Sequence, residues 1–187
     1  DIQHIKYMFA GCNKLTSIDL SGFSFVNILD ISAIFSDCFD LETLILPQNE
    51  MASNIKDFSN MFHGCLKLKE IDLSNIDFAE AKKLQYMFYE CKSLTSINFY
   101  TSMKATKIES IYYMFSFCEK LTSIDLSDFS FVKTKRLIAM FFYCSNLETV
   151  ILPKDEISTI VEDISYIFAI CFKLKTIDLS GISFINI

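Results

Sequence analysis

Residues 61–74 have the sequence MFHGCLKLKEIDLS, and variants of this stretch follow one another along the whole chain. Its pattern is Met/Ile-Phe-x-x-Cys-x-x-Leu-x-x-Ile-x-Leu. All seven cysteines occupy the same slot, 26 or 27 residues apart, and they number the repeats one to seven: Cys12, Cys38, Cys65, Cys91, Cys118, Cys144 and Cys171. A fixed period of this length predicts a solenoid, in which each coil packs against its two neighbours.

The first half of each repeat predicts a short helix. In the third repeat, Phe58, Met61, Phe62 and Cys65 fall at positions i, i+3, i+4 and i+7, which lie on one face of a helix. An oxygen-bearing side chain often precedes this run and could cap free backbone N–H groups. The capping candidates are Asp30, Asp57, Ser110 and Asp163. Helices of about two turns are not stable alone, so stacking must hold them.

The second half of each repeat predicts a short strand. In the first repeat, alternation sends Ile18 and Leu20 inward and leaves Ser17, Asp19 and Ser21 facing solvent. One strand and one helix per coil predicts an α/β solenoid, with parallel strands on one side and helices on the other. We expect residues 1–187 to form a single domain of about seven coils. Because the chain starts and stops inside the pattern, we expect a longer array.

Two kinds of repeat alternate, which explains the two spacings. Odd repeats end in Ile-Asp-Leu-Ser, as at residues 71–74, whereas even repeats carry Leu46-Pro47, Phe99-Tyr100 or Leu152-Pro153 at that point. A longer period of four repeats is also visible, because residues 15–21 recur verbatim at residues 121–127. This pattern indicates duplication of a block of several repeats.

The pattern resembles the BspA-type leucine-rich repeats of surface proteins and lipoproteins in bacteria and some parasitic protists. This resemblance covers the whole chain and implies a right-handed solenoid with a β-sheet on one face. Many such proteins are described as surface adhesins that bind host or matrix proteins. The resemblance therefore implies a non-enzymatic protein-binding module at the cell surface or outside the cell, although residues 1–10 carry no signal peptide. The alternative is an intracellular or assembly scaffold built on the same solenoid.

The chain departs from the commonest leucine-rich repeat in the turn after the strand. That pattern places asparagine three residues after the last strand leucine, where it satisfies backbone groups of the turn. Here Asn49 matches, whereas Ser102 and Asp155 are approximate matches. Odd repeats place apolar residues there: Phe23, Ile76, Phe129 and Ile182. We expect aromatic packing to fill this corner and the turn N–H groups to find other partners.

The outward strand positions form the candidate binding face, since solenoids commonly bind partners there. This face consists of a central column with one neighbouring tyrosine: Asp19, Ile45, Asp72, Asn98, Tyr100, Asp125, Ile151 and Asp178. The aspartates occur in every second repeat. Their alternation either separates like charges on adjacent strands or provides a docking track for a basic partner. The flanking hydroxyl-rich columns could bind a protein or a glycan, or could be solvated sheet alone.

Composition argues against several classes of function. The net charge is −6 and Arg136 is the only arginine, so a nucleic acid or an anionic membrane surface is not the expected partner. The longest apolar runs, of about eight residues, are shorter than the roughly 18 that a transmembrane helix needs. Only His4 and His63 could act as histidine bases, so a Cys65–His63 pair would be peculiar to one repeat. We expect no catalytic site, cofactor or metal, and the sequence does not indicate the oligomeric state.

Two residue types have alternative interpretations. The cysteines are expected to be buried free thiols, one per coil, although coils stacked about 5 Å apart would also allow disulfides between neighbours. Tyr7, Tyr86, Tyr113 and Tyr166 precede the Met/Ile-Phe slot. We expect them to pack in the core or at the helix edge; the alternative is an aromatic binding stripe.

Overall fold

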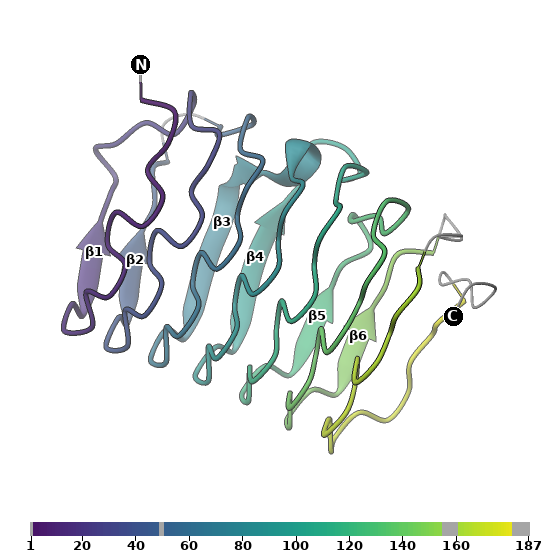
Figure 1. Ribbon diagram of the computed structural model, residues 1–187. Coiled ribbons are helices and arrows are strands. Elements are labelled where there is room, and N and C mark those ends of the chain that lie inside the picture. The colour runs from purple at the N-terminus through teal and green to yellow at the C-terminus, as the bar shows by residue number, and fades with distance from the viewer. Residues whose placement is uncertain (1, 49–50, 155–160, 181–187) are drawn as a thin grey trace.

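The chain winds into a row of coils with short parallel strands along one side (Figure 1). The computed structural model describes residues 2–48, 51–154 and 161–180. The strands are β1 (Ser17–Asp19), β2 (Thr43–Ile45), β3 (Glu70–Asp77), β4 (Ser96–Tyr100), β5 (Ser123–Asp125) and β6 (Thr149–Ile151). The 3-10 helix η1 (Phe78–Glu80) follows β3 and is the only helix within these residues. In this part of the chain, no helix has the length and apolar character that crossing a membrane requires.

The strands pair two by two. β1 pairs with β2, β3 with β4, and β5 with β6, all in parallel. The register aligns equivalent positions of neighbouring coils, for example Ile18 with Leu44 and Ile124 with Val150. In the described part of the chain, no strand pairing joins β2 to β3 or β4 to β5. The alternation of repeats in the sequence therefore appears in the structure as alternation between paired and unpaired neighbours.

The prediction of a helix in the first half of each coil is wrong for the described residues, which form stacked turns instead. In coil three, the Phe62 N–H donates to the Met87 carbonyl (2.8 Å), and the Gly64 N–H donates to the Tyr89 carbonyl (2.8 Å). A helix would send these N–H groups four residues back along its own chain. Asn60 and Gly64 also have φ of 57° and 71°, which breaks a right-handed helix. Two tight turns place apolar residues three and four positions apart, as a helix does. The sequence pattern therefore could not distinguish the turns from a helix.

One phenylalanine from each coil joins a continuous stack through the core. Neighbouring ring centroids lie 5.3 to 5.8 Å apart, with interplanar angles of 14° or less. The stack contains Phe9, Phe35, Phe62, Phe88, Phe115, Phe141 and Phe168. Aliphatic residues from the strands complete a core cluster that extends from the first coil to the seventh. Each coil thus buries its apolar face mainly against its neighbours.

The cysteines lie beside this stack as free thiols, as predicted. The Cys65 thiol donates to the carbonyl of Phe35 (3.2 Å), and the Cys91 thiol donates to the carbonyl of Phe62 (3.1 Å). Each of these bonds links a coil to the preceding one. Burial raises the pKa of Cys65 and Cys91 well above that of an exposed thiol. The five thiols of coils two to six are buried, whereas Cys12 and Cys171 in the end coils are partly exposed.

Aromatic packing fills the corner after the central strands, as predicted. Phe99 contacts Phe129 at 5.3 Å between ring centroids, and Phe78 contacts both rings. Phe129 is buried, whereas Phe23 at the same position of the first coil is half exposed. The predictions for Asn49, Asp155 and Ile182 concern residues outside the described ranges.

We predict that Phe62→Asp unfolds the central coils, because it places a charge between two stacked rings. Phe62→Ala should lower the free energy of unfolding by about 3–5 kcal/mol, the usual cost of removing a buried phenylalanine side chain. Urea denaturation followed by circular dichroism measures both effects. The matched control is Phe172→Ala, because this phenylalanine is 77% exposed. An unchanged melt for Phe62→Asp would contradict the position of this ring in the core.

Candidate binding surface

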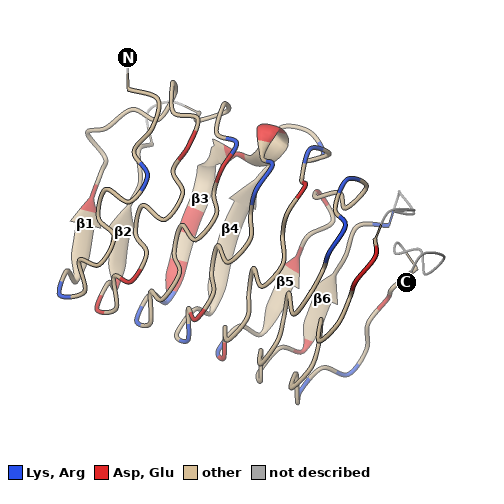
Figure 2. Ribbon diagram, in the orientation of Figure 1, with Lys and Arg blue, Asp and Glu red and all other residues tan. Residues whose placement is uncertain are grey.

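All eight residues of the predicted binding face are exposed on the strand side of the solenoid. The strand register places them side by side in pairs, with Asp19 beside Ile45, Asp72 beside Asn98, and Asp125 beside Ile151. Figure 2 shows the acidic positions on β1, β3 and β5. Large apolar side chains are exposed on the even strands, where Ile45, Tyr100 and Ile151 are 44%, 40% and 42% accessible. Along this surface, the odd strands therefore present carboxylates, and each even strand exposes one large apolar side chain.

The aspartates of this column have a structural role that the sequence analysis missed. In each, Oδ1 accepts a hydrogen bond of 2.8 or 2.9 Å from the backbone N–H two residues later. The pairs are Asp19 with Ser21, Asp72 with Ser74, Asp125 with Ser127, and Asp178 with Ser180. These are Asx-type contacts, which supply a partner for a backbone N–H group. Asp19 and Asp125 are the last residues of β1 and β5, whereas Asp72 lies inside β3. The Asp-x-Ser spacing was the sequence signal for this role.

These hydrogen bonds favour the ionised form of Asp19 and Asp72. Backbone donation from Ser21 and Ser74 lowers the pKa of Asp19 and Asp72 below 3.8, the ordinary value for this group. The Lys154 ammonium lies 2.9 Å from Asp178 Oδ2 and is the largest cause of the lowered pKa of Asp178. The face is therefore negatively charged near neutral pH.

Among the described residues, grooves lie on this face at two places where neighbouring coils make no strand pairing. The larger, with a volume of about 360 Å³, lies between β4 and β5, and its lining includes Asn98, Thr101, Ser123, Asp125 and Asp128. The second, of about 290 Å³, lies between β6 and the seventh coil. Both occur at a junction from an even to an odd repeat. The alternation is visible in the sequence, but the grooves are not, because they depend on which strands exchange hydrogen bonds.

Comparison with known proteins places the chain in a repeat family. Residues 59–187 match the model of the BspA type leucine rich repeat region, in six copies. The chain belongs to the BspA-type leucine-rich-repeat family. Residues 3–113 also match a model described as Mycoplasma protein of unknown function, DUF285. The search of curated proteins found no match to this sequence.

Two solved structures of leucine-rich-repeat proteins are similar to this BspA-type chain. The chain is 21% identical to a leucine-rich repeat protein from Bacteroides ovatus, with a TM-score of 0.41, and 92% of the chain is covered. The chain spans 51% of that protein. It is 20% identical to the leucine-rich repeat protein TpLRR of T. pallidum, with a TM-score of 0.47, covering 93% of this chain and 72% of the other.

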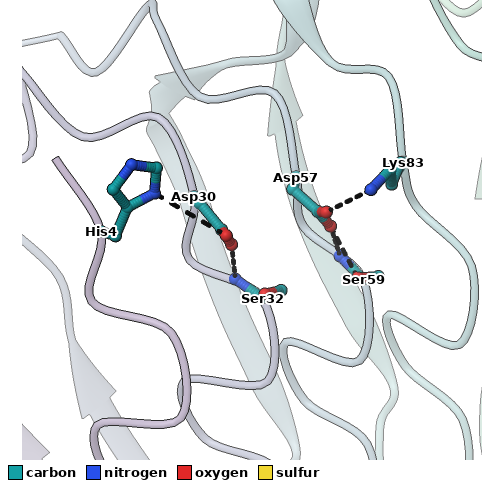
Figure 3. Close-up of polar contacts among 6 residues, drawn as sticks. All are labelled: His4, Asp30, Ser32, Asp57, Ser59 and Lys83. Atoms are coloured by element: carbon teal, nitrogen blue, oxygen red, sulfur yellow. Dashed lines mark hydrogen bonds and ion pairs between the residues drawn. The ribbon is translucent and has the colours of Figure 1, made fainter.

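The stacked turns of this BspA-type solenoid carry a second column of aspartates (Figure 3). Asp30 and Asp57 accept hydrogen bonds from the N–H groups of Ser32 (2.9 Å) and Ser59 (3.0 Å). Asp57 also pairs with Lys83 of the next coil at 3.0 Å. Asp163 makes the same contact with the Ser165 N–H. The predicted capping is confirmed for these three aspartates, although they cap turns rather than helices.

An aromatic cluster covers part of the stacked turns in coils four to six. Tyr86 stacks on Tyr113 at 5.1 Å between centroids, and Phe117 contacts Tyr89 at 5.5 Å and Tyr143 at 5.4 Å. All five side chains are partly exposed. Of the four predicted tyrosines, Tyr86 and Tyr113 are therefore partly buried and pack at the edge of the stacked turns, by stacked and edge-on contacts between neighbouring coils. Tyr7 and Tyr166 are exposed, so the prediction of packing does not hold for them.

The Cys65–His63 pair has the wrong environment for nucleophilic chemistry. The Cys65 thiol is fully buried, donates to a backbone carbonyl, and has a raised pKa, whereas a reactive cysteine needs a lowered pKa and access to solvent. The described residues also contain no group of three or more His, Cys, Asp or Glu side chains arranged to hold a metal ion. Within the described residues, neither this pair nor a cluster of metal ligands therefore offers a reactive centre.

We predict that Asp72→Ala lowers the free energy of unfolding by about 1 kcal/mol, because the Ser74 N–H loses its acceptor. Asp72→Asn should retain most of the stability, since an amide oxygen can accept the same bond. Chemical denaturation measures the difference. Glu70→Ala is the control, since it removes an exposed carboxylate from the same strand. Equal losses for the alanine and asparagine variants would contradict the hydrogen-bonding role.

The Asx-turns also predict loss of stability in acid. The pKa values of Asp19 and Asp72 are lower in the folded than in the unfolded chain, so ionisation favours folding above the unfolded pKa of about 4. This contribution disappears as the pH falls through the folded pKa values. The free energy of unfolding should therefore fall below about pH 4. The double variant Asp19→Asn, Asp72→Asn should show a shallower fall, whereas an identical pH profile would contradict the assignment.

Proposed function

We propose that this solenoid is a non-enzymatic protein-binding module whose ligand contacts the strand side. The observation that carries the proposal is the exposure of Ile45, Tyr100 and Ile151 on the even strands. Exposing such side chains costs solvation free energy, and a partner would remove this cost. Tyrosine in particular is enriched at protein interfaces. Leucine-rich-repeat solenoids also commonly use this surface for binding.

The charge pattern indicates what such a partner presents. Carboxylates of Asp19, Asp72 and Asp125 lie beside Ile45, Asn98 and Ile151 in register. A complementary protein surface would combine apolar side chains with basic ones. A glycan is the other ligand class that the hydroxyl groups of this face could bind, and the experiment below separates the two.

Within this proposal, the most specific role is adhesion at the cell surface to a host or matrix protein. The BspA-type repeat is the first support. A second is that five of the seven thiols are buried, so they would remain reduced in an oxidising environment. We further propose that residues 1–187 form one right-handed repeat domain within a longer array, since the phenylalanine stack is continuous across coils and parallel crossovers are nearly always right-handed.

An assembly scaffold built on the same solenoid is the alternative function. Protease treatment of intact cells, followed by detection of the full-length protein, separates the alternatives, because only a surface protein is cleaved while cytoplasmic markers persist.

We predict that the double variant Tyr100→Ala, Ile151→Ser weakens binding to a matrix protein at least about tenfold, since both side chains are proposed contacts. Biolayer interferometry against collagen, laminin and a glycan array measures this effect. The control Tyr7→Ala removes a tyrosine that is 62% exposed on the stacked turns and should bind normally. Binding to glycans alone would show that the ligand is a glycan and not a protein. Equal binding by the double variant and by the Tyr7→Ala control would show that the contact lies elsewhere.

A further inference from the structure

The groove between β4 and β5 lacks a cation that its counterpart contains. In the groove between β6 and the seventh coil, Lys154 Nζ lies 2.9 Å from Asp178 Oδ2. Two repeats earlier in the sequence, the positions of Lys154 and Asp178 are occupied by Thr101 and Asp125. Both residues line the larger groove, and no lysine or arginine is among the residues that line it. Asp125 therefore supplies the same carboxylate as Asp178, but Thr101 does not supply the ammonium group that Lys154 provides.

The two carboxylates are held in the same way. Oδ1 of Asp178 accepts the Ser180 N–H at 2.9 Å, and Oδ1 of Asp125 accepts the Ser127 N–H at 2.8 Å. The Asx-turn thus fixes one oxygen and leaves the other available. In the seventh coil the available oxygen binds the Lys154 ammonium. Within the described residues, no ion pair reaches Asp125.

The remaining walls of the larger groove suit an ammonium group. Such a group has three N–H donors and needs several acceptors. Hydroxyl groups of Thr101 and Ser123 line the groove together with the Asp125 carboxylate. In addition, the facing edges of β4 and β5 make no strand pairing with each other, and carbonyl groups along such edges can accept hydrogen bonds. The groove therefore offers charge complementarity and several acceptors in one place.

We propose that the groove between β4 and β5 binds a lysine side chain presented by a protein partner. The internal Lys154–Asp178 pair is the structural precedent for this contact. Ile151 lies beside Asp125 in register and is exposed, so apolar side chains around the lysine would also find a contact. A free cation would leave this apolar surface uncovered. This inference rests on the proposed function of the strand side as a protein-binding surface.

A titration with a blocked peptide tests the inference. The peptide Gly-Ser-Lys-Ser-Gly is added to ¹⁵N-labelled protein, and an otherwise identical peptide carries norleucine in place of lysine. Only the lysine peptide should shift the amide signals of Thr101 and Asp125 in a saturable manner. A third peptide with arginine shows whether the groove accepts any cationic side chain. Equal shifts with norleucine, or none with lysine, would overturn the proposal.

Two reciprocal variants provide matched controls. Thr101→Lys recreates the internal ion pair beside Asp125 and should weaken binding of the lysine peptide by up to about fivefold, as expected for competition by an exposed ion pair. Lys154→Thr releases Asp178 and should create a second site, seen as new shifts in the seventh coil. Thermal melts check that both variants remain folded. Unchanged binding by Thr101→Lys, with no new site in Lys154→Thr, would refute the inference.

The same variants distinguish this inference from the proposed function. Suppose that a matrix protein loses binding with Tyr100→Ala, Ile151→Ser but binds Thr101→Lys normally. The strand side then binds protein, and the lysine contact is wrong. Suppose instead that the lysine peptide binds the groove while no protein partner depends on the strand side. The groove chemistry then holds, and the proposed protein-binding function fails.

Discussion

Each coil completes its backbone hydrogen bonding with the neighbouring coil, and the rest of the structure depends on this constraint. In the stacked turns, alternate N–H groups donate to carbonyls of the following coil, as Phe62 does to Met87. The phenylalanine stack and the cysteine thiols connect the same neighbours. A coil removed from the row would lose both its hydrogen bonds and its buried apolar surface. Stability is therefore shared between neighbours, as expected for a solenoid, and no coil is an independent unit.

Much of this architecture could be predicted from the sequence because buried positions recur with a strict period. The inward direction of Ile18 and Leu20 and the free thiols follow from that period, and the structure confirms them. The helix prediction failed for a physical reason. The spacing of apolar residues indicates which side chains share a face. It does not indicate whether a backbone N–H donates to a carbonyl of its own coil or of the next coil. Left-handed φ values at bulky residues such as Tyr86 and Tyr113 left no recognisable signal, since glycine and asparagine normally mark them.

The candidate binding face was predictable in position but not in chemistry. Strand alternation was sufficient to place Asp72 and Asp125 in solvent. Their carboxylates also accept a backbone N–H group two residues later, so the recurrence of aspartate in this column is explained without a ligand. The grooves could not be predicted, because they arise where adjacent strands fail to pair. The proposed contacts are therefore argued from positions that differ between otherwise equivalent coils.

One such position differs among the three junctions that lead from an even repeat to an odd repeat. It is occupied by Gln48, Thr101 and Lys154 in successive even repeats. Gln48 accepts a hydrogen bond from Asn75 at 3.1 Å, and Lys154 pairs with Asp178, so two of the three side chains are used by the solenoid itself. Thr101 is too short and uncharged to neutralise Asp125. The Asp125 and Asp178 carboxylates accept the same backbone hydrogen bond, so this single substitution removes the ammonium partner while the carboxylate is held in the same way. Repetition supplies the scaffold, and one variable residue per pair of coils is sufficient to differentiate the surface.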